Sequence, residues 1–527
     1  MRRDCALKRN LCLAAAAEKR YTESDAEFAK PLFARCANKP YHPKKSRNIM
    51  SAFISKSKIV ATLGPASFLP AVQRRLMAAG VDGFRLNLSH GDFGEHAAVI
   101  ASLRKISGEM GRPVAIIVDL PGPKMRLGMV PKPITVRRGA KVRFWPASQP
   151  RPGRGIFLPH EISGLAQGVR PGSIIFVGDG MMQFKVKSIE GEIIETEALV
   201  AGVVRSNKGV NIPGYNAPSG ALTEEDKRGI AFAIQHQADV ICISFVGSSE
   251  DMLAARALLP QTGNYRPCLL AKIERRQAVA NLDSILAQAD AVMVARGDLG
   301  IELPIEEIPG LQKDIIHRAN LAAKPVIVAT QMLLSMVDNA RPTRAEVTDV
   351  ANAILDGADA IMFSEETAIG HDPVAVVRIA KKIARQTERR LVKSGGVALE
   401  VRAAIRSEDS IDDLISSATC DVLENRTVDL AVTPTATGAT ARRIARLRPR
   451  PWIVAVTDNQ TVRNILALSS GVFPLYVSSV SLSDRELAEL LKSAGLIRSG
   501  TRRLVITAGS LTGVAGTTNS LKIIDVS

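Results

Sequence analysis

Eight short apolar segments recur along the first three quarters of the chain, and helical patterns lie between most of them. Their limits are 58–63, 83–88, 113–120, 239–245, 268–273, 291–296, 325–330 and 359–364. Buried strands that alternate with helices are typical of a parallel sheet, and eight such units close into a (β/α)8 barrel. The sequence therefore predicts a TIM barrel over residues 51–128 and 213–390.

Two regions depart from this rhythm. Residues 129–212 are rich in Gly and Pro and contain short alternating runs, which predict an inserted domain built as a small β-barrel. From residue 395 to residue 527 a second series of helical and apolar segments predicts a C-terminal α/β domain.

Residues 1–50 differ in composition from the rest of the chain. They carry twelve Lys and Arg against five Asp and Glu, and Met50 directly precedes the first regular pattern. We expect a disordered extension or the product of an upstream start codon, with an organelle-targeting arm as the alternative. No apolar run reaches the length of a membrane span.

Composition excludes some partners. The formal net charge is +17, but basic residues do not gather with aromatic ones, which make up 4% of the chain. We therefore expect no nucleic-acid partner and no membrane partner. The six Cys show neither a CxxC pair nor metal-ligand spacing, which indicates reduced thiols and a cytoplasmic protein.

The C-terminal ends of the predicted strands carry an unusual number of reactive side chains. They are Thr62, Arg85, Asn87, Ser89, His90, Asp119, Lys272, Glu274, Arg296, Asp298, Thr330, Ser364 and Glu366. Active sites of such barrels lie at this rim. Each residue alone can be read as a structural ion pair, but together the cations, carboxylates and hydroxyls favour phosphoryl transfer. Glu274 and Asp298, at the ends of adjacent strands, can share a hard divalent cation.

At these residues the chain resembles a known family. KIVATLGPAS, RLNLSHG, DLPGPKMR, KGVNIPG, AKIE, MVARGDLGIE, ATQML, PTRAEVTDVANAILDGAD and SEETA are similar, in order and spacing, to pyruvate kinase. The likeness is dense over residues 57–385 and thinner over 410–527. It implies transfer of a phosphoryl group from phosphoenolpyruvate to ADP, a lid formed by residues 129–212, a regulatory C-terminal domain and a homotetramer.

The resemblance also implies roles. Glu274 and Asp298 would hold Mg²⁺ or Mn²⁺, and Lys272 would neutralise the phosphoryl group in flight. Arg85 would clamp phosphate, while Gly297, Asp298 and Thr330 would orient phosphoenolpyruvate or pyruvate. Thr330, with a water, would deliver the proton to the enolate. The residues expected to face the nucleotide are Thr62, Pro65, Asn87, His90, Arg126 and Lys208.

A monovalent cation site is implied as well, formed by Asn87, Ser89, Asp119 and the carbonyl of Leu120. Lys124 stands where K⁺-dependent relatives usually have Glu, so its ammonium could replace the ion. We therefore predict that K⁺ is dispensable, the alternative being a Lys turned to solvent. Leu120, in place of the frequent Thr, points the same way.

In the C-terminal domain, Thr435, Thr437, Gly438 and Thr440 form either an anion cradle for a phosphorylated effector or an ordinary helix N-cap. The loop 508–519 has no Lys or Arg for a second phosphate. Pro121 and Gly247 depart from the family pattern with no effect that we can predict. Another metal-dependent barrel enzyme acting on phosphoenolpyruvate or an oxo-acid, or a silent binding protein, are the alternative functions.

Overall fold

The computed structural model describes residues 55–527, except 152, 163, 179, 215–221, 395–400, 402, 405–409, 425–427, 498–499, 510–517 and 527. The prediction for residues 1–50 lies outside the described residues, as does most of the loop 508–519.

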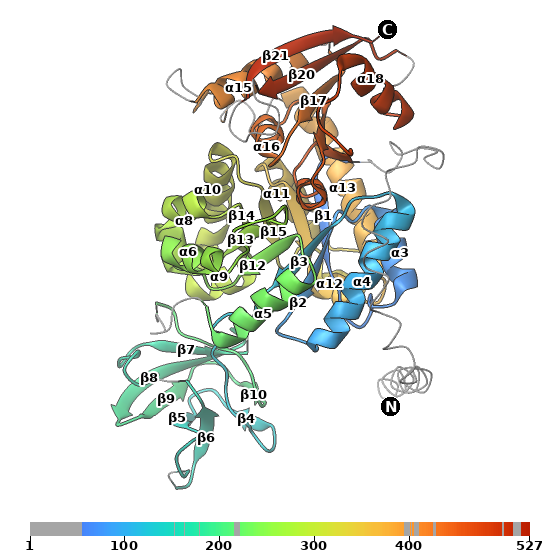
Figure 1. Ribbon diagram of the computed structural model, residues 1–527. Helices are drawn as coiled ribbons and strands as arrows, with labels where there is room; N and C mark the ends of the chain where they lie inside the picture. The colour runs from blue at the N-terminus through green and yellow to red at the C-terminus, as the bar shows by residue number, and fades with distance from the viewer. Residues whose placement is uncertain are drawn as a thin grey trace. The chain divides into compact units, whose positions relative to one another are not determined.

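Eight parallel strands close into a barrel, which confirms the predicted fold (Figure 1). Around the barrel their order is β1, β16, β15, β14, β13, β12, β3 and β2. Their bounds are β1 Lys58–Thr62, β2 Gly83–Asn87, β3 Ala115–Asp119, β12 Val240–Ile243, β13 Cys268–Ile273, β14 Ala291–Ala295, β15 Val326–Ala329 and β16 Ala360–Phe363. Because both faces of these strands are covered, they read as continuous apolar runs rather than as alternating ones.

Helices surround the barrel, and all of them except the short α12 bury apolar side chains against it. They are α3 Pro70–Ala79, α4 Phe93–Met110, α5 Glu224–Gln235, α6 Ser249–Ala257, α7 Arg276–Ala280, α8 Leu282–Gln288, α9 Arg296–Glu302, α10 Ile308–Leu321, α11 Arg344–Leu355, α12 Glu365–Ala368 and α13 Pro373–Ser394. Several begin with a side-chain cap. Thr223 starts α5 and Thr343 starts α11, each in a capping box that fixes where the rim loop ends and the helix begins.

The insertion after β3 is all β, as predicted. Its strands are β4 Ile134–Val136, β5 Lys141–Pro146, β6 Ile156–His160, β7 Ile174–Val177, β8 Met182–Glu190, β9 Ile193–Ala198, β10 Gly202–Val204 and β11 Val210–Asn211. Among the described residues they pair as a six-stranded sheet and a separate two-stranded one, rather than as one closed barrel. A core of its own, including Phe144 and Phe184, holds the insertion together.

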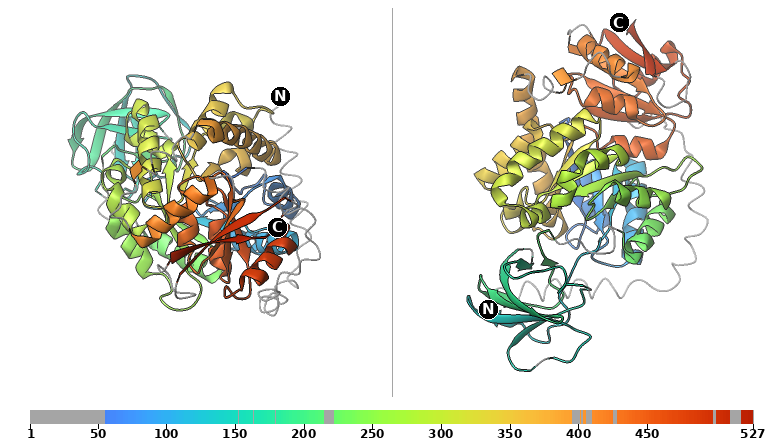
Figure 2. Two further views of the ribbon diagram at one scale, coloured as in Figure 1. Left: turned by 90° about the horizontal axis from the view of Figure 1, so that it is seen from above. Right: turned by 90° about the vertical axis from the view of Figure 1, so that its left-hand side faces the viewer.

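The C-terminal domain is α/β, as predicted. Its elements are α15 Ile411–Glu424, β17 Leu430–Pro434, α16 Ala439–Ala445, β18 Trp452–Thr457, α17 Gln460–Leu466, β19 Val472–Tyr476, α18 Asp484–Ser493, β20 Arg503–Gly509 and β21 Thr518–Asp525. The sheet order is β19, β18, β17, β20 and β21, with β21 antiparallel to β20. This domain and the insertion lie at opposite ends of the barrel (Figure 2).

An aspartate directly precedes each of four barrel strands, and its carboxylate caps the beginning of the neighbouring strand. Each accepts a hydrogen bond from a backbone N–H at or next to the start of that neighbour. The pairs are Asp82 with Ile59 (2.9 Å), Asp239 with Ile116 (2.7 Å), Asp290 with Leu269 (2.9 Å) and Asp359 with Val326 (3.1 Å). We call this end, where the strands begin, the lower end of the barrel.

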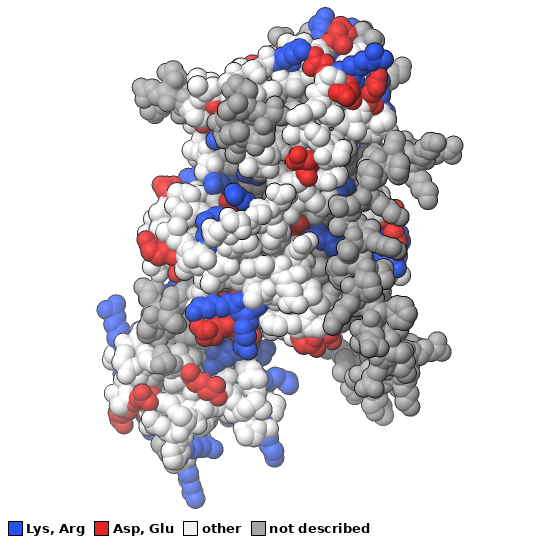
Figure 3. Space-filling model, viewed as in Figure 1, with Lys and Arg blue, Asp and Glu red and all other residues white. Residues whose placement is uncertain are grey.

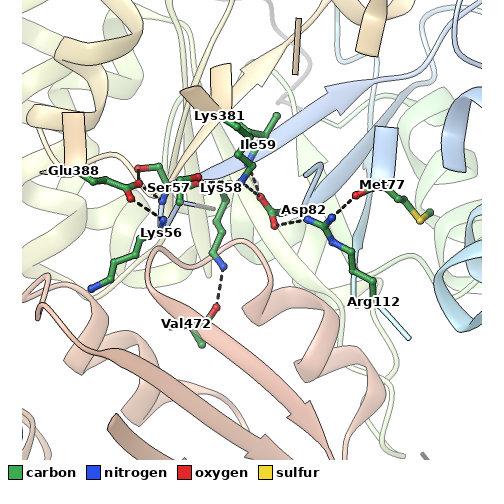
Figure 4. Close-up of polar contacts among 11 residues, drawn as sticks. Lys56, Ser57, Lys58, Ile59, Met77, Asp82, Arg112, Lys381, Glu388 and Val472 are labelled. Carbon is green, nitrogen blue, oxygen red and sulfur yellow. Dashed lines mark hydrogen bonds and ion pairs between the residues drawn. The ribbon is translucent and has the colours of Figure 1, made fainter. Parts of the chain in front are cut away.

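The C-terminal domain closes the lower end. Leu468 belongs to the cluster of apolar side chains inside the barrel. Lys58 Nζ donates to the carbonyl of Val472 over 2.8 Å (Figure 4). Lys56 Nζ donates to the carbonyls of residues 449–451. The barrel opens to solvent at its other end, which we call the rim. Within the part of the chain described, no helix combines the length and apolar content that crossing a membrane would require.

Candidate active site

A cavity of about 290 Å³ lies at the rim, between the barrel and the two segments that lead into the insertion. Its lining is Arg85, Asn87, Ser89, His90, Asp119, Leu120, Pro121, Lys124, Arg126, Asn207, Lys208, Gly209, Ser244, Phe245, Lys272 and Asp298. Five of these are Lys or Arg, and Figure 3 shows basic side chains gathered where the insertion joins the barrel. The cavity therefore suits an anionic ligand.

Arg85, at the C-terminal half of β2, is fixed by two neighbours. Its Nε and its Nη2 each lie 2.6 Å from Oδ2 of Asp119, and its Nη1 donates to Thr62 Oγ1 over 3.2 Å. Burial alone would raise the pKa of Asp119, but Arg85 and Lys272 outweigh it and hold that pKa below its usual value. The Arg85 guanidinium is thus held in a fixed orientation in the wall of the cavity. Thr62 is buried beneath it and supports it instead of lining the cavity.

Lys272 stands near the end of β13 and Glu274 directly follows the strand, and their side chains meet. Lys272 Nζ lies 2.9 Å from Glu274 Oε2 and 3.4 Å from Ser244 Oγ. Burial lowers the pKa of Lys272, yet Glu274, Asp119 and Asp298 together raise it above its ordinary value, so this ammonium keeps its proton. Glu274, only 1% exposed, has its pKa raised to about 7, chiefly by burial.

The loop after β15 places Thr330 against the start of α9. Gly297 N donates to Thr330 Oγ1 over 2.8 Å, and this hydroxyl donates to the carbonyl of Ala329 over 2.6 Å. Thr330 and Gln331 both have positive φ, +70° and +56°. This conformation is uncommon for any residue other than glycine, and it is strained for the β-branched Thr330. The strain is held by Arg296, which donates to the carbonyl of Thr330 over 2.9 Å.

Two carboxylates could hold a divalent cation at this rim. Asp298 lines the cavity, and Glu274 lies beneath it with one oxygen 2.6 Å from the backbone N–H of Phe245. No group of three or more His, Cys, Asp or Glu side chains suited to a metal occurs among the described residues. Mg²⁺ is commonly bound by one or two carboxylates with substrate oxygens and waters completing its shell, so this pair fits such an ion.

On the side toward the insertion, His90, Arg126 and Lys208 line the cavity as expected for nucleotide contacts. Arg126 Nη1 donates to the carbonyl of Asn207 over 3.2 Å, which ties the two connecting segments together. Burial, and then the charges of Arg126, Arg85 and Lys124, lower the pKa of His90, so its ring is neutral at physiological pH. Pro65 is exposed and does not belong to the cavity lining.

The residues expected around a monovalent cation come together. Asn87, Ser89, Asp119 and Leu120 all line the cavity, and so does Lys124. The carbonyl of Leu120 already accepts a hydrogen bond of 2.7 Å from Ser244 Oγ.

The expected effector residues lie in the C-terminal domain, around the first turn of α16. Gly438 is the N-cap, in the left-handed region. Thr435 Oγ1 accepts from Gly438 N over 2.8 Å, Thr437 Oγ1 accepts from Ala439 N over 3.4 Å, and Thr440 Oγ1 lies 2.6 Å from Thr518 Oγ1. Thr435 and Thr437 therefore bond backbone N–H groups of the turn that leads into α16, while Thr440 bonds a side chain of β21.

The sequence prediction gave no role to five lining residues: Pro121, Asn207, Gly209, Ser244 and Phe245. Pro121 stood out in the sequence only as a departure from the family pattern. Ser244 and Phe245 directly follow β12, so the rule that assigned the other strand ends would have found them. Asn207 and Gly209 flank the predicted Lys208 and carry no separate signal.

Comparisons with known proteins agree with this geometry. Residues 54–377 match the family model "Pyruvate kinase, barrel domain" and residues 413–524 match "Pyruvate kinase, alpha/beta domain". A pyruvate kinase of Thermococcus litoralis is 40% identical over 89% of this chain and 98% of its own, and one of Clostridium acetobutylicum is 36% identical over 89% and 99%. The crystal structure of a pyruvate kinase from Cryptosporidium parvum superposes with a TM-score of 0.84 at 30% identity, covering 91% of this chain and 97% of that one. The chain therefore belongs to the pyruvate kinase family, the glycolytic phosphotransferases that form pyruvate and ATP from phosphoenolpyruvate and ADP.

Proposed function

We propose that the rim cavity is where this chain performs the family's reaction, with Lys272 facing the transferred phosphoryl group. One observation carries the assignment. The Lys272 ammonium is buried near three carboxylates, Glu274, Asp119 and Asp298, and these keep it charged where it lines the cavity. A fixed cation in such surroundings stabilises the negative charge of the phosphoryl group far more than it would in water.

Glu274 and Asp298 would hold the divalent cation that the family requires, Mg²⁺ or Mn²⁺. When bound, that ion supplies Lewis-acid stabilisation of the phosphoryl and carboxylate oxygens. The buried Glu274 is oriented for this by the N–H of Phe245. Asp298 stands in the first turn of α9, where the helix dipole favours a negative charge.

Arg85 would bind phosphate oxygens with guanidinium edges that Asp119 and Thr62 keep in place. Gly297, Asp298 and Thr330 would orient phosphoenolpyruvate or pyruvate. Protonation of the enolate would use the Thr330 hydroxyl and a water. For this the hydroxyl has to leave the carbonyl of Ala329, to which it now donates.

Asn87, His90, Arg126 and Lys208 would contact the diphosphate of ADP, with the exposed Pro65 near the base. Thr62, buried beneath Arg85, would act only by holding that guanidinium. The insertion would act as the lid, since Arg126 and Lys208 lie on its two connections to the barrel. A barrel enzyme that acts on phosphoenolpyruvate or an oxo-acid without a nucleotide would not need these cations.

A coupled assay decides between these functions. Purified protein with phosphoenolpyruvate, ADP and Mg²⁺ should form pyruvate and ATP in equal amounts, and omission of ADP should stop both. Pyruvate release that does not depend on ADP would contradict the proposal. Replacing Mg²⁺ with Mn²⁺ in the same assay tests which ion is preferred.

We also propose that K⁺ is dispensable because the Lys124 ammonium serves in its place. Lys124 lines the same cavity as Asn87, Ser89, Asp119 and Leu120. Its charge also contributes to lowering the pKa of His90, which indicates that the ammonium is near the rim.

The test compares wild type with Lys124→Glu in tetramethylammonium buffer, with and without K⁺. Wild type should be largely active without K⁺, and the variant should require it, because the new carboxylate adds a negative charge that only a cation offsets. Stimulation of the wild type by about a hundredfold, equivalent to nearly 3 kcal/mol, would contradict the proposal.

Three further proposals rest on the family resemblance. The protein would be a homotetramer located in the cytoplasm, where its buried thiols Cys242, Cys268 and Cys420 would stay reduced. A sugar or nucleotide monophosphate would bind at Thr435, Thr437, Gly438 and Thr440 and activate more strongly than fructose bisphosphate. Activation by the bisphosphate that is lost in Thr440→Ala would contradict the last of these.

A further inference from the structure

The turn between β2 and α4, residues 88–92, carries two of the cavity residues, Ser89 and His90. Its beginning is fixed where Leu88 N donates to the carbonyl of Asp119 over 3.0 Å. Its end is fixed by the side chain of Asp92, which caps α4. The middle of the turn is held from the helix, because His96 Nε2 lies 2.8 Å from the carbonyl oxygen of His90.

This contact determines the tautomer of His96. A carbonyl oxygen only accepts, so Nε2 carries the hydrogen and Nδ1 is left as an acceptor. His96 is 4% exposed, and its Nδ1 has no partner among the described residues. An unpaired buried acceptor is unfavourable, and an apolar side chain would fill the same space without one. What the imidazole adds to this place is therefore the bond to the turn.

The backbone passes close to the ring. Gly91 has φ of +75°, and a Cβ built on it would lie 3.3 Å from His96 Nε2 and 3.1 Å from Glu95 Oε2. The conformation favours glycine, and the space leaves little room for any other residue. The turn and the ring are thus fitted to each other.

We propose that His96 is a positioning residue for nucleotide use, which holds the turn so that His90 and Asn87 face the cavity. The inference rests on the proposed nucleotide side of the site. His96 acts through the backbone of His90, and it lies outside the cavity lining. Loss of the bond lets the turn move away from the cavity without disturbing Lys272, which stands on β13, or Glu274, which directly follows it.

The experiment compares three substitutions by steady-state kinetics. His96→Gln keeps an N–H at about the reach of Nε2, His96→Asn places its amide nearer the backbone, and His96→Met has similar length with no donor. In the His96→Met and His96→Asn variants the KM for ADP should rise about tenfold, which is the effect of losing one hydrogen bond. The KM for phosphoenolpyruvate should change less than about twofold. Gln should remain close to wild type. Binding of ADP measured by calorimetry with Mg²⁺ should weaken in parallel.

Three results would overturn the proposal. An equal rise of both KM values, or an equal rise of the KM for ADP in the Gln and Met variants, would indicate a packing role only. An unchanged KM for ADP in folded Met and Asn variants would show that the bond does not affect nucleotide use. If Met fails to fold, the comparison of Gln with Asn decides. Failure of the wild type to use ADP would instead overturn the proposed function itself.

Discussion

The two ends of the barrel each bury a lysine, and the two lysines behave in opposite ways. Lys272 at the rim has its pKa raised, because three carboxylates outweigh the effect of burial. Lys58 at the lower end is 2% exposed, and burial lowers its pKa to about 8, with Asp82 compensating only in part. Both lysines are buried, so the charged groups around each one decide whether its pKa rises or falls.

The carboxylates at the two ends of the barrel also differ in what they bind. At the lower end, Asp82 accepts from the backbone of β1, from Lys381 Nζ over 2.9 Å and from Arg112, so its oxygens are used within the protein (Figure 4). At the rim, Asp119 is likewise paired, with Arg85, but Asp298 lines the cavity, where a ligand can reach it. One end is closed by the C-terminal domain and serves stability, while the other leaves its charges for ligands. The comparison teaches that a buried charge gains a function where the fold leaves it open to a ligand.

The largest effect is expected for Lys272→Met. It removes the cation that we propose faces the phosphoryl group, and one such contact is worth about 10² to 10³ in rate. We expect kcat to fall at least that far while the circular dichroism spectrum stays that of the wild type. Near-normal turnover would place the catalytic cation elsewhere.

The counterpart at the lower end is Lys381→Met, which leaves Asp82 buried with one cation fewer. Breaking a buried pair by removing one partner costs about 3–5 kcal/mol. Urea unfolding should report a loss of this size, and the kcat of the folded fraction should be unchanged. The neighbouring Lys382, which is exposed, provides the control, because Lys382→Met should change neither quantity. A fall in kcat with Lys381→Met would show that the lower end influences the rim.

The smallest effect concerns pH. Lys58 faces Asp82, Lys381, Arg112 and Glu388, and its folded pKa of about 8 lies below the 10.5 of an exposed lysine. Between these values the unfolded chain binds more protons, so the contribution of Lys58 to the free energy of unfolding rises with pH, by at most about 1.4 kcal/mol per unit. Urea unfolding of wild type and Lys58→Met at pH 7.5, 8.5 and 9.5 measures it. The difference should move in favour of the wild type as pH rises, and parallel curves would show that Lys58 titrates normally.

Much of the rim could be predicted because two simple rules apply there. Strand patterning located the eight strands, and the rule that strand ends meet at one edge brought Arg85, Asp119, Lys272 and Asp298 into one cavity. Neither rule says how far a side chain reaches toward the ligand. The structure therefore decided that Thr62 lies beneath Arg85 and that Pro65 stays outside.

The lower end has a feature that the sequence analysis did not predict, the four aspartates that cap neighbouring strands. Asp82, Asp239, Asp290 and Asp359 each stand just before an apolar run, a repeat that could have been noticed in the sequence. Its meaning depends on which strand lies beside which, since each carboxylate bonds the neighbouring strand and not its own.

What the sequence determined by itself was the order of strands and helices and the chemistry at the strand ends, because both depend on local patterns along the chain. Tertiary structure alone decided which charges face the cavity. Lys58 and Lys272 each lie in an apolar strand run, but one meets the carbonyl of Val472, 414 residues away, and the other meets Glu274 and the cavity. Such partners are set by the closure of the barrel and the docking of the C-terminal domain, and the pKa of a buried group depends on them.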